Sequence, residues 1–194
     1  MELRRPDLTL PAAEAEALRA AYSSAKTVLE YGAGGSTLMA AELGAEVWAV
    51  ESDPAWAQMM QDWFGANPTA GRAHILHADI GPTKEWGHPK DESAFRNWPG
   101  YALKFWELRD VPHPDVVLID GRFRLASFMA TAFHITRPVT LYFDDYLPRP
   151  AYHKAEQLLK PSQIIGRMAR FDLLPIPLTP DRLGAFARAM LQPA

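Results

Sequence analysis

The sequence predicts an α/β fold in which a mostly parallel sheet carries helices on both faces. Two observations predict it. Short β-prone segments alternate with helical ones along the 194 residues, as expected of parallel strands joined by crossover helices. The segment 115–119 is a nearly continuous apolar run, which is typical of a strand buried on both faces.

Local signals mark the individual elements. Asp53 can cap free N–H groups and Pro54 suits the first helical position, so a helix should begin there. Gly44 stands where the preceding helix needs a left-handed residue to end. Helices are expected at residues 11–22, from Ser36 or Thr37 to about 43, and at 54–64, 125–135, 152–159 and 181–191. Strands are expected at residues 27–31, 46–50, 73–78, 115–119 and 139–143, with a two-stranded hairpin within 163–178.

Composition excludes several classes. Hydrophobic residues make up 48% and charged residues 22%, which excludes disordered and fibrous proteins for the bulk of the chain. The net charge of −3 argues against a broad nucleic-acid surface. With no cysteine there is no disulfide, thiolate nucleophile or cysteine-ligated metal site. No apolar run approaches the roughly 20 residues of a membrane helix, and Met1–Asp7 lacks a signal peptide's apolar core. We expect a soluble, cytoplasmic protein without nucleic-acid or membrane partners.

We expect one domain over residues 1–194, with an N-terminal helical segment at 1–24. Residues 81–113 form the longest connection and are rich in proline and tryptophan. Long connections in compact domains usually carry function. This one starts at the end of the third strand, so it could form a lid or a wall of a substrate site. The alternative is that its expected helix, residues 101–108, only packs on the sheet.

A glycine-rich turn follows the first strand. Its sequence, EYGAGGST over residues 30–37, offers close approach of backbone to ligand and the free N–H groups of a helix start. Thr37 stands where a dinucleotide-binding fingerprint needs its third glycine. Glu51 ends the second strand and could accept hydrogen bonds from ribose hydroxyls. We interpret this pattern as a binding site for a nucleoside cofactor. The alternative is that the glycines only form a turn and that Glu51 is a surface carboxylate without a ligand.

These residues resemble the first motifs of class I S-adenosylmethionine (SAM)-dependent methyltransferases. Glu30, Gly32 and Gly34 match the acidic-x-Gly-x-Gly motif, and Ser36 stands where many members have a further glycine. The resemblance covers most of residues 25–146. It implies a Rossmann-like seven-stranded mostly parallel sheet with helices on both faces and a C-terminal antiparallel hairpin. It also implies SAM as cofactor, held by these residues together with the carboxylates that end later strands: Glu51, Asp79 and Asp120.

Three aspartates follow the fourth and fifth strands. Asp120 ends the one, and Asp144 and Asp145 end the other, so the three carboxylates should converge on one sheet edge. Oxygen ligands suit a hard ion such as Mg²⁺, which could lower the pKa of a substrate hydroxyl. The pattern resembles metal-dependent small-molecule O-methyltransferases, which implies that all three are metal ligands and that Asp120 and Asp144 are catalytic. Phe123 departs from the resemblance, since the catechol type has a catalytic lysine there. The alternative is that Asp120 contacts cofactor or substrate while the other two cap the following loop.

Candidate bases and cations lie nearby. His88 and Lys84 in the insert and His153 after the aspartates could act as a general base, although a lone histidine is more often structural. Arg122 and Arg124 match carboxylate or phosphate geometry and indicate an anionic acceptor. The alternative is that they pair with the aspartates of the site or with Glu51.

The sequence therefore predicts methyl transfer from SAM to a small-molecule acceptor, at oxygen and with metal assistance. Two alternatives stay open. One is a degenerate domain that binds the cofactor or a protein partner without catalysis. The other is a transferase that uses a different nucleoside-type donor, for example in aminopropyl transfer. The sequence names neither the acceptor nor the oligomeric state.

Overall fold

The computed structural model describes residues 4–193, so residues 1–3 and 194 of the expected domain lie outside the described residues. Its helices are α1 (Ala12–Tyr22), α2 (Gly35–Glu42), α3 (Pro54–Ala66), α4 (Pro99–Leu103), α5 (Arg124–His134) and α6 (Pro180–Ala189). Its 3-10 helices are η1 (Glu85–Gly87), η2 (Phe95–Asn97) and η3 (Pro150–Gln157). Its strands are β1 (Thr27–Tyr31), β2 (Glu46–Glu51), β3 (Arg72–His77), β4 (Thr83–Lys84), β5 (His88–Pro89), β6 (Val116–Ile119), β7 (Val139–Phe143), β8 (Gln163–Ile165) and β9 (Met168–Leu173).

One seven-stranded sheet organises the fold, in the order β3-β2-β1-β6-β7-β9-β8. The first five strands run parallel, while β9 is antiparallel to β7 and β8 to β9. The predicted parallel sheet with a C-terminal antiparallel hairpin is confirmed. The strand order reverses between β1 and β6, which is the place where ligands bind in open α/β sheets.

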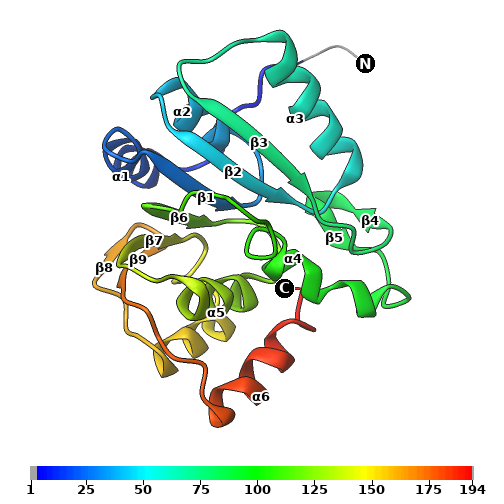
Figure 1. Cartoon of the computed structure of the whole chain (residues 1–194), viewed down its shortest axis with the longest axis vertical. Coiled ribbons are helices and arrows are strands. Elements are labelled where there is room, and N and C mark those ends of the chain that lie inside the picture. The colour runs from blue at the N-terminus through cyan, green and yellow to red at the C-terminus, as the bar shows by residue number, and fades with distance from the viewer. Residues whose placement is uncertain (1–3, 194) are drawn as a thin grey trace.

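Helices cover both faces of the sheet (Figure 1). Leu29 and Val117 face a core built with α4, α5 and α6, whereas Val28 and Leu118 face a core built with α1 and α2. Helix α3 packs with β2 and β3 on the same face as α2. Neighbouring residues of one strand thus contact opposite cores, which explains why β1 and β6 are buried throughout.

Capping chemistry accounts for the helix boundaries. Asp53 accepts a hydrogen bond from the Trp56 N–H over 2.8 Å, and Pro54 opens α3, as predicted. Gly44 has a φ of 95° just after α2, also as predicted. Two predictions were wrong in detail. Helix α3 continues through Gly65 to Ala66, because Asn67 rather than Gly65 ends it. The segment predicted as a helix at 152–159 is instead the 3-10 helix η3.

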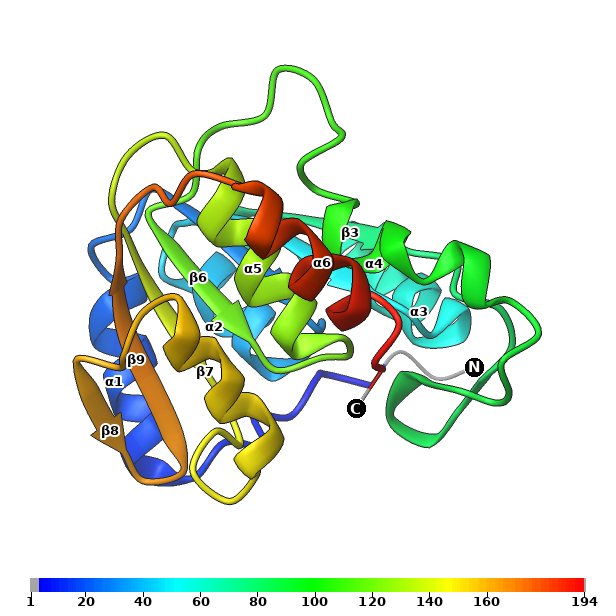
Figure 2. The ribbon, with the colours of Figure 1, turned by 90° about the horizontal axis from the view of Figure 1, so that it is seen from below.

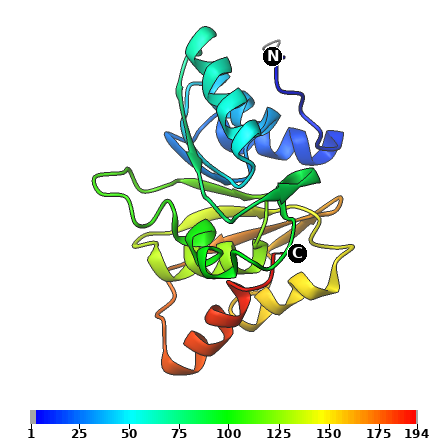
Figure 3. The same ribbon diagram turned by 90° about the vertical axis from the view of Figure 1, so that its right-hand side faces the viewer.

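The insert 81–113 holds the strands β4 and β5 with η1 between them, followed by η2 and α4. Strands β4 and β5 pair as an antiparallel hairpin, and α4 is shorter than the predicted helix at 101–108. The hairpin lies beside the carboxyl ends of β2 and β3 (Figure 1), and the two turned views place it on the side of the molecule where the C-terminus also lies (Figure 2, Figure 3). Within residues 4–193, no helix is long and apolar enough to span a membrane.

Candidate active site at the carboxyl ends of the strands

The turn after β1 is tight because the main chain at Gly32 packs directly against the main chain at Gly121. Gly32 has a φ of 103°, and a Cβ placed on it would lie 2.9 Å from the backbone nitrogen of Gly121. Gly34 donates its N–H to the Thr37 hydroxyl over 3.0 Å, and that hydroxyl donates to the Glu30 carboxyl. Apart from its chain neighbours, no atom of residues 4–193 lies within 4 Å of the position of a Cβ at Gly34. This side of the turn has room for a ligand.

Glu30 supports the turn from inside the protein. Its side chain is fully buried and accepts a hydrogen bond from the Tyr22 hydroxyl over 2.7 Å, in addition to the one from Thr37. Burial raises the pKa of Glu30 to about 7, although these two hydrogen bonds lower it. The structure places Glu30 beside the predicted turn, where its carboxyl accepts hydrogen bonds from the hydroxyls of Tyr22 and Thr37.

Two further expected cofactor carboxylates differ in environment. Glu51 is buried and accepts hydrogen bonds from the backbone N–H groups of Ala33, Ser52 and Asp53 at 3.2, 2.7 and 2.8 Å. Burial raises the pKa of Glu51, and these hydrogen bonds oppose the rise. Asp79 is exposed and accepts a hydrogen bond from a backbone N–H two residues ahead, over 2.9 Å. Glu51 therefore ties the glycine turn to the start of α3, and Asp79 organises its own loop.

The β4–β5 hairpin covers the end of β2. Gly87, at its tip, accepts a hydrogen bond from the Ser52 hydroxyl over 2.9 Å. A Cβ at Gly87 would collide with that hydroxyl and would lie 3.2 Å from Glu51 Oε1. The neighbouring Trp86 is 80% exposed and has a φ of 62°, a strained conformation for a bulky residue. The hairpin is thus closed over the carboxylate that was predicted to hold a ribose.

The aspartates of the fifth parallel strand are neutralised by arginines. Asp144 is fully buried after β7 and forms a two-pronged pair with Arg167, at 2.6 and 3.0 Å. Burial raises the pKa of Asp144, but the hydrogen bonds from Arg167 and from the Asp145 N–H, together with the charges of Arg167 and Arg124, hold it below its usual value. Asp145 lies 3.2 Å from Arg149, 3.2 Å from Arg167 and 3.4 Å from Arg124.

Asp120 ends β6 and stands between these groups. Arg124, itself 3% exposed, lies 3.2 Å from one Asp120 oxygen and also donates to backbone carbonyls of the loop. Burial raises the pKa of Asp120, Arg124 opposes the rise and Asp144 adds to it. About a third of the side chain, 32%, remains exposed. Asp120 therefore combines access to solvent with a carboxyl that holds its proton at higher pH than usual.

The expected magnesium site is not supported. The three aspartates Asp120, Asp144 and Asp145 do meet at one edge, as predicted, but arginine guanidinium groups supply the opposing charge. Within the described part of the chain, no group of three or more His, Cys, Asp or Glu side chains is arranged to hold a metal ion. The alternative in which Arg124 pairs with the aspartates of the site is confirmed.

The candidate bases are engaged or exposed. The Nε2 atom of His88 contacts the Arg122 guanidinium, and burial together with Arg122 lowers the pKa of His88 to about 4. His153 lies 3.1 Å from a backbone carbonyl and packs against the Tyr146 ring. Lys84 is exposed on the hairpin. His88 binds a proton weakly, and a ring nitrogen of His153 contacts a carbonyl. These environments do not favour either histidine as the general base.

Sequence reasoning missed several residues of this edge. The Tyr101 hydroxyl fills the space beside Gly121 and accepts a hydrogen bond from the Arg122 N–H over 3.2 Å. Arg167 comes from the turn between β8 and β9. No local pattern places Arg167 beside β7, because that contact depends on the register of the antiparallel hairpin. The only available signal was the excess of carboxylates, which required cations from elsewhere in the chain.

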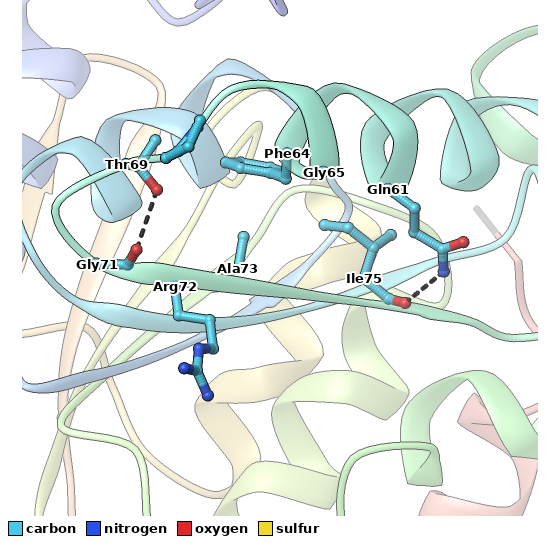
Figure 4. A pocket seen from close by; sticks show the side chains of 9 residues that line it. Gln61, Phe64, Gly65, Thr69, Gly71, Arg72, Ala73 and Ile75 are labelled. Atoms are coloured by element: carbon cyan, nitrogen blue, oxygen red, sulfur yellow. Dashed lines mark hydrogen bonds between the residues drawn. The ribbon is translucent and has the colours of Figure 1, made fainter.

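Two hollows of the surface lie away from these strand ends. One, of about 390 Å³, lies between α3 and β3, where Gln61 donates to the Ile75 carbonyl over 3.0 Å (Figure 4). The other, of about 380 Å³, lies among α5, η3 and α6.

The strand order, the glycine turn after the first strand and the carboxylates at successive strand ends define a class I methyltransferase fold. Among solved structures, a methyltransferase-like protein from Silicibacter pomeroyi is 51% identical, with a TM-score of 0.93 over 97% of this chain and 99% of that one. The chain belongs to the class I SAM-dependent methyltransferase family.

More distant structures share the fold. The O-methyltransferase TomG from Streptomyces achromogenes, in complex with SAM, is 14% identical, with a TM-score of 0.58 over 87% of this chain and 83% of that one. The 16S rRNA methyltransferase RsmC from T. thermophilus is 19% identical, with a TM-score of 0.51 over 84% of this chain and 42% of that one. Comparisons with family models and with curated proteins gave no match.

Proposed function

We propose that this protein transfers a methyl group from SAM to a hydroxyl oxygen of a small anionic molecule. One observation carries the proposal: the turn that is open at Gly34 touches, through Gly32 and Gly121, the loop that bears Asp120. A cofactor-binding turn and a partly exposed carboxyl thus share one edge at the point where strand order reverses. The net charge of −3 favours a small molecule over a nucleic acid as acceptor.

The residues at the turn fit the cofactor in part. The backbone of Gly32 and Gly34 offers the cradle, and Glu51 offers a carboxylate once the hairpin has moved away from it. When bound, SAM would supply the methyl group. Asp79 is exposed, and its carboxylate could accept a hydrogen bond from the adenine of the cofactor in addition to the one from the Gly81 N–H. Glu30 is assigned to hold the turn in shape.

Asp120 is our candidate for the general base. Its raised pKa brings proton affinity closer to neutral pH, where a base works best, and its exposed third lets an acceptor approach. Asp144 fixes Arg167, and Arg124 fixes Asp120, so the base is oriented by ion pairs. No step is assigned to a metal ion. The described residues would act as one catalytic domain, in a reducing compartment such as the cytoplasm.

Thermal unfolding with S-adenosylhomocysteine, in the presence of a chelator, tests the cofactor site. At 100 times Kd the ligand should add about 2.7 kcal/mol of stability, which corresponds to a Tm shift of about 5–11 °C. The matched variants are Gly34→Leu and Gly65→Leu. Both positions are open and neither has a left-handed φ, but only the first fills the proposed site. Loss of the shift in Gly34→Leu alone supports the proposal, and equal shifts in both variants contradict it.

One observation favours a second candidate, a domain that binds a partner without catalysis. The hairpin tip occupies the approach to Glu51. A wild-type protein that shows no shift with the ligand, with or without Mg²⁺, would favour this candidate. A different nucleoside-type donor is separated from SAM by competition between donors in the same assay.

A further inference from the structure

Arg122 carries a buried charge that no carboxylate of the described residues compensates. Its side chain follows β6 and the residue is 7% exposed. No carboxylate within residues 4–193 lies within 4 Å of its guanidinium, whereas Arg124, Arg149 and Arg167 all have one. Its contact with His88 brings a neutral ring, because the pKa of His88 is lowered to about 4. A buried cation without a counter-charge is costly unless it serves a ligand.

The free edge of this guanidinium has a defined geometry. The atom that contacts His88 is one terminal nitrogen, and the Nε atom is buried with no hydrogen-bond partner among residues 4–193. The edge formed by Nε and the other terminal nitrogen is the fork that binds two oxygens of one anionic group.

A second unpartnered donor lies in the same cluster. The Tyr152 hydroxyl, on η3, is buried and has no hydrogen-bond partner in the described part of the chain, and the residue is 2% exposed. Tyr152 is an electrostatic neighbour of Arg122, and its ring lies 5.7 and 5.8 Å from the guanidinium carbons of Arg124 and Arg149. Two orphaned polar groups, one after β6 and one on η3, thus belong to one cluster in which positive charge is in excess.

We infer that Arg122 and Tyr152 form the subsite for a carboxylate or phosphate group of the acceptor. The inference rests on the proposed function and names the chemistry of its substrate. The position suits an acceptor and not the donor. The turn, Glu51 and Asp79 follow β1, β2 and β3, whereas Arg122 and Tyr152 follow β6 and β7 on the other half of the sheet. Asp120 lies between the two halves. Because His88 belongs to the hairpin, opening the hairpin would expose Arg122 together with Glu51.

The test uses sodium benzoate and inorganic phosphate as probes, with neutral benzamide as the matched control for benzoate. Binding is followed by thermal unfolding and calorimetry at constant ionic strength. The variants are Arg122→Gln, Arg122→Lys, Tyr152→Phe and, as a control, Arg72→Gln, which is exposed at the opposite end of the sheet. Arg122→Gln should fold at least as well as wild type, because it removes an uncompensated buried charge.

We expect an anionic probe to bind wild type and Arg72→Gln, and benzamide to bind neither. Arg122→Gln should weaken that binding at least about tenfold, and Tyr152→Phe should weaken it several-fold. Arg122→Lys should restore part of it, since the charge returns without the fork. The shift with S-adenosylhomocysteine should stay unchanged in Arg122→Gln.

Each other outcome is decisive. Equal affinity in wild type and Arg122→Gln, or no anion binding to wild type, overturns the inference. Loss of S-adenosylhomocysteine binding in Arg122→Gln alone also overturns it, because the fork would then hold the carboxylate of the cofactor. If wild type binds the anion through Arg122 but never binds S-adenosylhomocysteine, the subsite stands and the proposed function fails. Preference between benzoate and phosphate identifies the anionic group.

Discussion

Replacing Glu30 by glutamine should remove a large part of the pH dependence of stability. The carboxyl is fully buried, and its pKa rises from the ordinary 4.5 to about 7 in the fold. Between these values the folded state keeps a proton that the unfolded state has released, so stability falls as pH rises. A difference of this size corresponds to about 3 kcal/mol lost between pH 4.5 and the region above pH 7.

Glu30→Gln keeps the shape of the side chain without its charge. The amide oxygen can still accept from Thr37, while the amide N–H group can donate to the Tyr22 hydroxyl, whose own proton then needs another acceptor. That rearrangement should cost about 1 kcal/mol. The variant should therefore be slightly less stable than wild type near pH 5 and more stable by about 2 kcal/mol near pH 8.

Urea unfolding at several pH values between 5 and 8 measures this difference. Other buried carboxyls contribute to the slope in both proteins, so the informative quantity is the wild-type curve minus the variant curve. Glu16→Gln, an exposed change on α1, is the control and should give a difference that does not change with pH. Parallel curves for wild type and Glu30→Gln would refute the argument, since Glu30 would then be equally charged in both states.

The ion pairs and the hairpin support three further predictions. Asp144→Asn removes the buried carboxylate that pairs with Arg167 and leaves Arg167 with Asp145 alone, at 3.2 Å. Because Arg167 is 39% exposed, the loss should be near the lower end for buried pairs, about 3 kcal/mol in urea at pH 7. The pKa of Asp144 is lowered in the fold, so this contribution should disappear as pH falls through and below the ordinary aspartate range, and a loss that persists there would contradict it. Gly87→Ala brings a Cβ against Ser52 at a φ of 67°, so the hairpin should detach and be cleaved faster in limited proteolysis, and unchanged cleavage would argue against the contact. Asp120→Asn should remove the rising limb of the pH–rate profile, and a retained limb would exclude Asp120 as the base.

Strand ends are predictable from sequence because parallel strands present their carboxyl ends at one edge. This rule alone brings Glu30, Glu51, Asp120 and Asp144 near one another, and the strand pairing agrees with it. The apolar runs and the capping residues determine the elements that carry them. The positions of the strand ends are therefore predictable from local sequence patterns and from the geometry of parallel strands.

The charge balance of the site is not predictable in the same way. Arg167 is 23 residues from Asp144, and its contact depends on how an antiparallel hairpin registers against β7. The sequence therefore leaves the carboxylates without cations and suggests a metal ion. The structure of the insert is not predictable from the sequence for another reason. Its short strands and the left-handed Trp86 have no periodicity, and their positions depend on contacts with Ser52 and Arg122.

The backbone contact between Gly32 and Gly121 has a mechanical consequence. Two loops that touch through bare main chain have no side chains between them to absorb a displacement. A ligand that shifts the first loop should press directly on the loop that carries Asp120 and Arg122. Donor and acceptor would then influence each other's affinity by the same factor, as thermodynamic linkage requires. A change at either glycine should uncouple the two even where it leaves both separately able to bind.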